Sequence, residues 1–148
     1  MSDRTTFAIR LISPEGVQFD GESQIAILNG VGGDVGLLAN HAPIVADLKM
    51  GTCRLQDSDG AWHTWATAEG FATSNNSRAT VLVEEAINVD DIDIAAADEL
   101  ITEHTNRIAD ADKHGGEHDV YSSGVEGSKR SVAWGEHLKA VHAAHASN

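Results

Sequence analysis

The chain has 148 residues, of which 41% are hydrophobic, and its 23 acidic and 10 basic side chains give a net charge of −13 at pH 7. A chain of this length forms one domain, or a small domain with an appendage, and its acidic balance argues against binding nucleic acid or anionic lipid. Cys53 is the single cysteine, so an intrachain disulfide is excluded and a reducing compartment is expected. The sequence contains no run of 18 apolar residues and does not begin like a signal peptide, so we expect a soluble protein without direct membrane insertion.

The first 88 residues are predicted to form β structure. Apolar Phe7, Ile9 and Leu11 occupy alternate positions, which is the period of two of a strand with one face on a core. Pro14 and Gly16 then suggest a turn. Short strand-like runs follow at residues 17–19, 24–28, 52–56, 62–66, 71–74 and 79–84. The expected breaks between them are at Gly21, Gly51, residues 57–60 and residues 75–76. Many short strands between turns predict a β-sandwich or barrel, with Cys53 as a packed core side chain.

The pattern becomes helical after residue 88. Asn88 or Asp90 is expected to cap a helix, because Asp residues in a first turn suit the positive end of the helix dipole. Side chains at spacings of three and four give this helix one narrow apolar stripe: Ile94, Ala97, Ile101, His104, Ile108 and Ala111.

A weaker second helix is predicted from about residue 120 to 146, after a break at Gly115-Gly116. Its apolar face is marked by Trp134, Leu138, Val141 and His145, and three glycines (Gly124, Gly127 and Gly135) lower its helix propensity. We therefore expect two domains, a β-sandwich of residues 1–88 and a helical hairpin of residues 89–148 with Gly115-Gly116 as its turn.

The stretch KHGGEHDVY, residues 113–121, contains the H-x-x-E-H pattern of one class of zinc peptidases. Such a site needs both histidines on one face of a stable helix, whereas Gly115 and Gly116 favour a break. We interpret the stretch as the hairpin turn. The alternative is a small zinc-binding protein that uses His114 and His118 together with the C-terminal histidines, which are His137, His142 and His145.

Other patterns give no support for catalysis. In GVGGDVG, residues 30–36, Val35 stands where the last glycine of a G-x-G-x-x-G phosphate loop would be, so a flexible turn between strands is expected. The sequence also has no G-x-S-x-G nucleophile elbow. We therefore predict no catalytic residues, no metal site and no cofactor.

One longer segment carries a family resemblance. Residues 33–51, GDVGLLANHAPIVADLKMG, are similar to the pattern G-[DE]-x-G-[IV]-L-x-x-H-A-P-L-V-x-x-L-x-x-G of the epsilon subunit of F-type ATP synthases. Residues 12–16, 19–22, 69–71, 80–86 and 90–93 extend the resemblance over about residues 7–98, and residues 119–121 resemble the start of the family's second helix. The resemblance implies a mostly β protein with α structure, an N-terminal β-sandwich of about ten strands followed by an antiparallel two-helix hairpin.

The resemblance also implies a function. The family member would be a non-catalytic rotor subunit of a proton-translocating ATP synthase, which joins the gamma subunit to the c-ring and restrains ATP hydrolysis through its C-terminal helices. It would be peripheral, on the cytoplasmic face of a bacterial plasma membrane. By position, the loop that faces the c-ring contains Asp34, His41, Ala42 and Pro43. Candidates for contact with the alpha and beta catalytic subunits are Lys129, Arg130 and Lys139.

One departure concerns ATP sensing. Some bacterial members sense ATP through a motif similar to [IL]-D-x-x-R-A, of which residues 92–97 keep Asp93 but carry Ala96 in place of the arginine. A methyl group cannot offer phosphate a forked cation, so ATP sensing is not expected. A relative with the same fold but altered regulation, suggested by the glycine-rich second helix, is a further interpretation.

Overall fold

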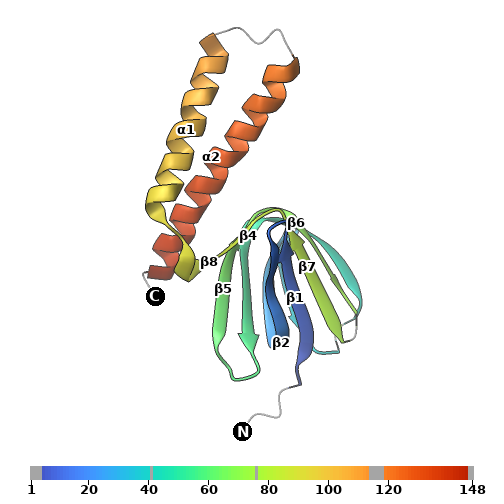
Figure 1. The fold of residues 1–148 in the computed structure, drawn as a ribbon. Coiled ribbons are helices and arrows are strands. Elements are labelled where there is room, and N and C mark those ends of the chain that lie inside the picture. Colours follow the sequence, from blue (N-terminus) through green and yellow to red (C-terminus); the bar gives the residue numbers. More distant parts are fainter. Residues whose placement is uncertain (1–4, 41, 76, 114–118, 147–148) are drawn as a thin grey trace. The chain divides into compact units, whose positions relative to one another are not determined.

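The computed structural model describes residues 5–40, 42–75, 77–113 and 119–146. The chain divides into two compact units, residues 1–91 and residues 92–148 (Figure 1). The division lies between Asp91 and Ile92, whereas the sequence suggested residue 88. The difference arises because a short 3₁₀ helix, Val89–Asp91, contacts β5 and so belongs to the first unit.

The first unit is built from eight described strands (Figure 1). Their bounds are β1 Phe7–Ser13, β2 Gly16–Gly30, β3 Gly33–Leu38, β4 Ile44–Asp57, β5 Trp62–Thr67, β6 Gly70–Ser74, β7 Arg78–Val83 and β8 Ala86–Asn88. The strand order is β3-β2-β1-β7-β6-β4-β5-β8, and an additional β2–β4 pairing links strands far apart in this order. The first half of β2 pairs with β1 and its second half with β3 and β4, so the sheet folds over onto itself.

Two long strands explain why there are eight described strands rather than about ten. The sequence suggested breaks at Gly21 and Gly51, but β2 and β4 continue through these glycines as strands of 15 and 14 residues. The flexible turn expected over residues 30–36 is also shorter than predicted. Gly33–Leu38 forms β3, which pairs with β2 from Gly33 to Leu38.

The core follows the predicted alternation. Phe7, Ile9 and Leu11 of β1 are buried, and Cys53 is a buried core side chain as predicted. The remaining core side chains come from the other strands and include Ala26, Leu28, Leu37, Leu48, Leu55, Trp65, Ala72, Ala79, Val81, Val83 and Ala86. Burial of these apolar faces is the main stabilising contribution to the unit.

The turn between β4 and β5 is organised by Asp57. Its Oδ1 accepts hydrogen bonds from the backbone N–H groups of Asp59 (2.9 Å) and Ala61 (3.0 Å), and its Oδ2 lies 2.8 Å from Nε2 of His63. The hydrogen bond with His63, helped by these backbone donors, holds the pKa of Asp57 below its ordinary value of 3.8.

This depressed pKa predicts an acid-sensitive turn. The stabilisation is present above the unfolded-state pKa and is lost as the pH falls through the lower folded-state value. We expect the thermal midpoint to fall as the pH is lowered below 3.8, and to fall less steeply in Asp57→Asn. Circular dichroism melts across this range measure the difference, with Asp59→Asn in the same turn as the control. An equal slope in Asp57→Asn and the unchanged chain would contradict the assignment.

The second unit contains helix α1, Ile94–Lys113, and helix α2, Asp119–Ala146. The N-cap of α1 is Asp93 rather than Asn88 or Asp90, since Asp93 Oδ1 accepts hydrogen bonds from the backbone N–H groups of Ala95 (2.9 Å) and Ala96 (3.3 Å). Asn88 instead caps the 3₁₀ helix, through a 3.0 Å bond from the Asp90 N–H group. Within the described residues, no helix is long and apolar enough to cross a membrane.

The predicted helix faces are partly correct. Ala97 of α1 is buried, as are Trp134 and Leu138 of α2, whereas His145 is exposed in the last turn and does not belong to the apolar face. The two helices pack extensively against each other. The predicted Gly115-Gly116 turn lies outside the described residues.

Candidate functional site

The segment that carries the family pattern begins at a tight turn between β2 and β3. Gly33 has a φ of +132°, a conformation that favours glycine, and the Val31 N–H group donates to the Asp47 carbonyl oxygen at 2.9 Å. A hollow of about 380 Å³ lies here and is lined by residues 30–35, Ala46 and Asp47. Because Asp34 and Asp47 line this hollow, it is unsuited to phosphate, and the phosphate-loop reading is not supported.

Asn29 forms hydrogen bonds with both Asp34 and Thr52. The Nδ2 of Asn29 donates to Asp34 Oδ1 at 2.9 Å, and Asn29 Oδ1 accepts from the backbone N (2.5 Å) and Oγ1 (3.2 Å) of Thr52. This hydrogen bond orients the exposed carboxylate at the start of β3. Asn29 was not identified from the sequence, because nothing in the spacing shows that it meets Thr52 on β4.

The second part of the predicted loop lies at the other end of β3. Asn40 adopts a left-handed conformation with a φ of 61°, and Ala42 and Pro43 are exposed before β4 begins. His41 lies outside the described residues. Asp34 belongs to β3 itself, so the structure places it and Pro43 at opposite ends of this strand rather than in one loop.

The three predicted cations of α2 have different surroundings. Lys139 Nζ lies 2.7 Å from Asp98 Oδ1 of α1, and Lys129 Nζ lies 3.6 Å from Glu126 Oε1 one turn earlier on α2. Arg130 is exposed. In this conformation Lys139 thus ties the two helices together, while the Lys129 pair lies within one helix.

Two histidines of the helical hairpin contact neighbouring side chains within it, whereas His145 is exposed. His104 Nδ1 lies 3.1 Å from the buried Ser128 Oγ, which joins α1 to α2, and the His137 ring lies 5.8 Å from the Trp134 ring, centroid to centroid. His114 and His118 lie outside the described residues. Among the residues that are described, no three His, Cys, Asp or Glu side chains are grouped as metal ligands would be.

Cys53 does not provide a reactive thiol. It is buried, and desolvation raises its pKa to about 12. Since the thiolate is the nucleophilic form, this cysteine is chemically inert in the folded chain at neutral pH.

Comparison with known proteins decides the family. Residues 6–89 match the family model described as the β-sandwich domain of the ATP synthase delta/epsilon chain. The chain belongs to this family. The match covers the whole described β-sandwich and confirms the predicted family and fold class.

Individual epsilon chains support this assignment. The ATP synthase epsilon chain of Desulforudis audaxviator is 32% identical over 107 residues, which cover 72% of this chain and 77% of that relative. The chloroplastic epsilon chain of Mesostigma viride is 36% identical over 83 residues, covering 56% of this chain and 62% of the relative. A chain in the structure of the Euglena gracilis mitochondrial ATP synthase shares the fold over 95% of this chain and 85% of its own, with a TM-score of 0.68 and 16% identity.

These relationships confirm the predicted epsilon-type subunit, a non-catalytic component of ATP synthase. The zinc-binding alternative is not supported, since the relatives are epsilon chains of ATP synthase.

Proposed function

We propose that this epsilon chain is a rotor subunit that joins the gamma subunit to the c-ring and restrains ATP hydrolysis through its helical hairpin. The observation that carries the proposal is the family match over residues 6–89, which coincides with the β-sandwich unit. The hairpin of residues 92–148 is a separate compact unit. Such a division suits a fixed contact made by one unit and a regulatory role for the other.

The proposed c-ring surface has two parts, one at each end of β3. At the start of β3, the oriented Asp34 carboxylate accepts charge-assisted hydrogen bonds from polar groups of the ring. At its other end, the exposed Ala42 and Pro43 extend the contact, and Pro43 restricts the backbone of the connection. We include His41 in this surface from its position in the family pattern.

The proposed contacts with the alpha and beta subunits use Lys129, Arg130 and Lys139. These cations suit acidic surfaces, and an extended hairpin would present them differently from the folded one. The 2.7 Å pair between Lys139 and Asp98 exists only while α1 and α2 are packed together, so extension would release Lys139 for another carboxylate.

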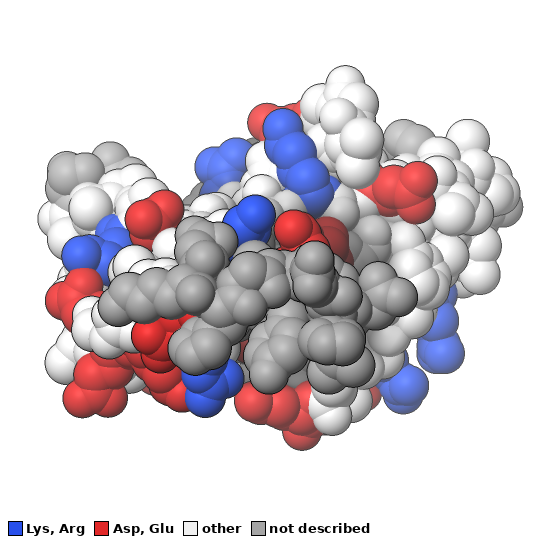
Figure 2. Space-filling model, turned by 90° about the horizontal axis from the view of Figure 1, so that it is seen from above, with Lys and Arg blue, Asp and Glu red and all other residues white. Residues whose placement is uncertain are grey.

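We further propose a peripheral location on the cytoplasmic face of a bacterial plasma membrane. The net charge of −13 disfavours direct attachment to anionic lipid. The negative net charge also disfavours binding of nucleic acid. In the view of Figure 2, Lys and Arg side chains are interspersed with Asp and Glu side chains. Attachment through the c-ring would therefore hold the chain at the membrane.

The c-ring contact is tested by reversing the charge of Asp34. The full chain is mixed with the gamma subunit and c-ring of the same organism, and the bound fractions are measured by co-purification. We expect Asp34→Lys to weaken retention by the c-ring by roughly tenfold or more, because a cation replaces the carboxylate that accepts hydrogen bonds from the ring. Retention by gamma should be unchanged.

The control is Glu22→Lys, which makes the same charge change at an exposed position of β2 away from β3. This variant should bind both partners like the unchanged chain. Failure of the unchanged chain to bind either gamma or the c-ring would overturn the rotor proposal as a whole. If the c-ring retained Asp34→Lys and Glu22→Lys equally, Asp34 would not be part of the contact.

A further inference from the structure

One side-chain amide connects three strands beside the candidate c-ring contact. Asn29 is the penultimate residue of β2, and its Nδ2 group donates a hydrogen bond to Asp34 Oδ1 of β3 at 2.9 Å. Its Oδ1 atom accepts hydrogen bonds from the backbone N–H group and the hydroxyl group of Thr52 in β4. The amide therefore uses both its donor and its acceptor, and it links β4 to the carboxylate on β3.

The backbone of β4 determines which way the amide faces. The Thr52 N–H group can only donate, so the amide oxygen must lie next to it and the NH₂ group must face Asp34. The register of the β2–β4 ladder shifts at this point, between Leu28 and Gly30. The side chain of Asn29 thus supplies a hydrogen bond to β4 where the ladder is irregular, and its orientation follows from that bond.

Gly51 leaves the space that the amide fills. A Cβ atom at Gly51 would overlap the Asn29 side chain, at 2.5 Å from its Cγ atom and 2.6 Å from its Cβ atom. Asn29 and Thr52 are half-buried, and Gly51 is buried. Because the amide is packed against β4 and bonded on both sides, its NH₂ group is held in one place before any partner binds.

The carboxylate next to this amide is exposed. Within the part of the chain that the structure describes, Asn29 is the hydrogen-bond partner of the Asp34 side chain, and the bond uses Oδ1. An exposed side chain without such a bond loses rotamer freedom when a partner orders it, which weakens binding. A carboxylate that is already oriented loses less, and its Oδ2 atom is left for the partner.

We propose that Asn29 is a positioning residue for the c-ring contact, because its amide holds the Asp34 carboxylate in the orientation that the ring binds. The inference rests on the proposed contact between Asp34 and the c-ring. Position 29 then needs a donor toward Asp34 as well as an acceptor toward Thr52. An aspartate at position 29 keeps the acceptor but places a second carboxylate beside Asp34.

The test measures c-ring retention of the full chain and of Asn29→Asp by co-purification at two pH values. At about pH 7.5 we expect retention of Asn29→Asp to fall roughly tenfold, because the hydrogen bond is replaced by a repulsion. At about pH 5 a proton shared by the two carboxylates restores a donor, so retention should return to within about twofold of the unchanged chain. Asp47 lines the same hollow but is common to both chains, so it does not explain a change in their ratio.

Two further variants control for charge and folding. Asn106→Asp makes the same exchange at an exposed position of α1, in the other unit, and should be retained like the unchanged chain at both pH values. Asn29→Asp combined with Asp34→Asn keeps the net charge and restores one donor and one acceptor between the two positions. This double variant should melt like the unchanged chain but bind the c-ring as weakly as Asp34→Asn alone, because the carboxylate has moved.

The outcomes separate this inference from the proposed contact. If Asp34→Asn weakens retention but Asn29→Asp does not, or weakens it equally at both pH values, Asn29 is not a positioning residue and the contact stands. If Asp34→Asn is retained like the unchanged chain, the contact itself is wrong and the inference fails with it. Thermal melts check folding. If Asn29→Asp does not fold, Asn29→Ala decides, with an expected loss of roughly three- to tenfold, and retention within about twofold of the unchanged chain would overturn the proposal.

Discussion

Replacing Gly70 by alanine should destabilise the β-sandwich by about 3 kcal/mol or more and lower its thermal midpoint by roughly 10–20 °C. Gly70 begins β6 and pairs with Val83 at the end of β7. A Cβ atom at this position would overlap the Leu82 carbonyl oxygen and lie 2.7 Å from the Val83 Cα atom. Both are backbone atoms that cannot turn aside, so β7 would have to move and its pairing with β6 would be disrupted.

The control for this prediction is Gly36→Ala in β3. Apart from its two chain neighbours, no described residue has an atom within 4 Å of a Cβ atom at Gly36, and the glycine does not have a positive φ. The substitution should therefore change the free energy of unfolding by less than about 0.5 kcal/mol. Circular dichroism or fluorescence melts of both variants give the comparison. Coincident melting of Gly70→Ala and the unchanged chain would show that β6 and β7 do not approach as closely as the structure indicates.

The glycines show where prediction of the fold from sequence stops. Alternation identified the buried face of β1, since side-chain direction in a strand is a local property. Gly51 was interpreted as a break, yet it lies within β4, where a Cβ would overlap the Asn29 side chain. Whether a glycine ends a strand or allows close approach depends on a partner 20 or more residues away in sequence, as between Asn29 and Gly51. A pattern within one segment does not contain that information.

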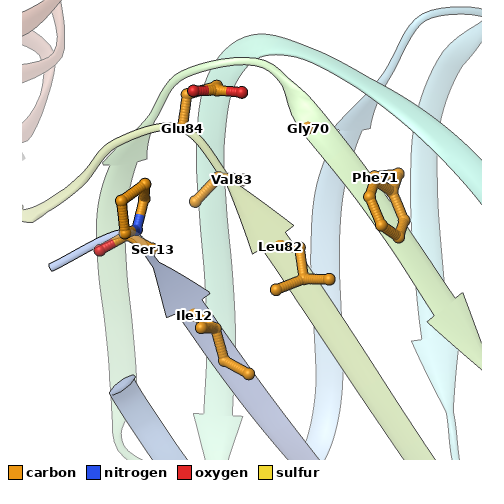
Figure 3. Close-up of a pocket in the computed structure, with 8 residues that line it drawn as sticks. Ile12, Ser13, Gly70, Phe71, Leu82, Val83 and Glu84 are labelled. Atoms are coloured by element: carbon orange, nitrogen blue, oxygen red, sulfur yellow. The ribbon is translucent and has the colours of Figure 1, made fainter. Parts of the chain in front are cut away.

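The same limit applies to the candidate site. The family pattern pointed to Asp34 and Pro43 but not to their separation by β3, which follows from strand pairing with β2. The neighbours of Ile12 could not be predicted either. Ile12 departs from simple alternation, because it is apolar at a position of β1 that faces outward, but only the strand register places it beside Leu82, and Leu82 beside Phe71 (Figure 3).

Replacing Gly135 by alanine should loosen the helical hairpin, although alanine is the better helix former. A Cβ atom at Gly135 would lie 2.7 Å from Ile101 Cγ1 and 3.1 Å from the Ala97 carbonyl oxygen, both on α1. The helices would have to separate, which we expect to destabilise their packing by about 1–3 kcal/mol. This cost outweighs the gain of roughly 1 kcal/mol in helix propensity. The measurement is hydrogen exchange of α1 and α2 amides, which should become faster.

Gly127→Ala, in the same helix, should have the opposite effect on amide hydrogen exchange. Among the described residues, nothing beyond the backbone of its own helix lies within 4 Å of a Cβ atom at Gly127, and the residue is exposed. The propensity gain of up to about 1 kcal/mol should therefore slow exchange in α2. If the folded hairpin and the extended, inhibitory hairpin compete, Gly135→Ala should increase inhibition of ATP hydrolysis in the assembled enzyme, because it weakens the packing that holds Lys139 against Asp98. Gly127→Ala should leave inhibition unchanged or reduce it, because it does not disturb that packing. Slower hydrogen exchange in both variants would contradict the close approach of α1 and α2 at Gly135. Equal inhibition of ATP hydrolysis by both variants would show that packing of the hairpin does not control inhibition.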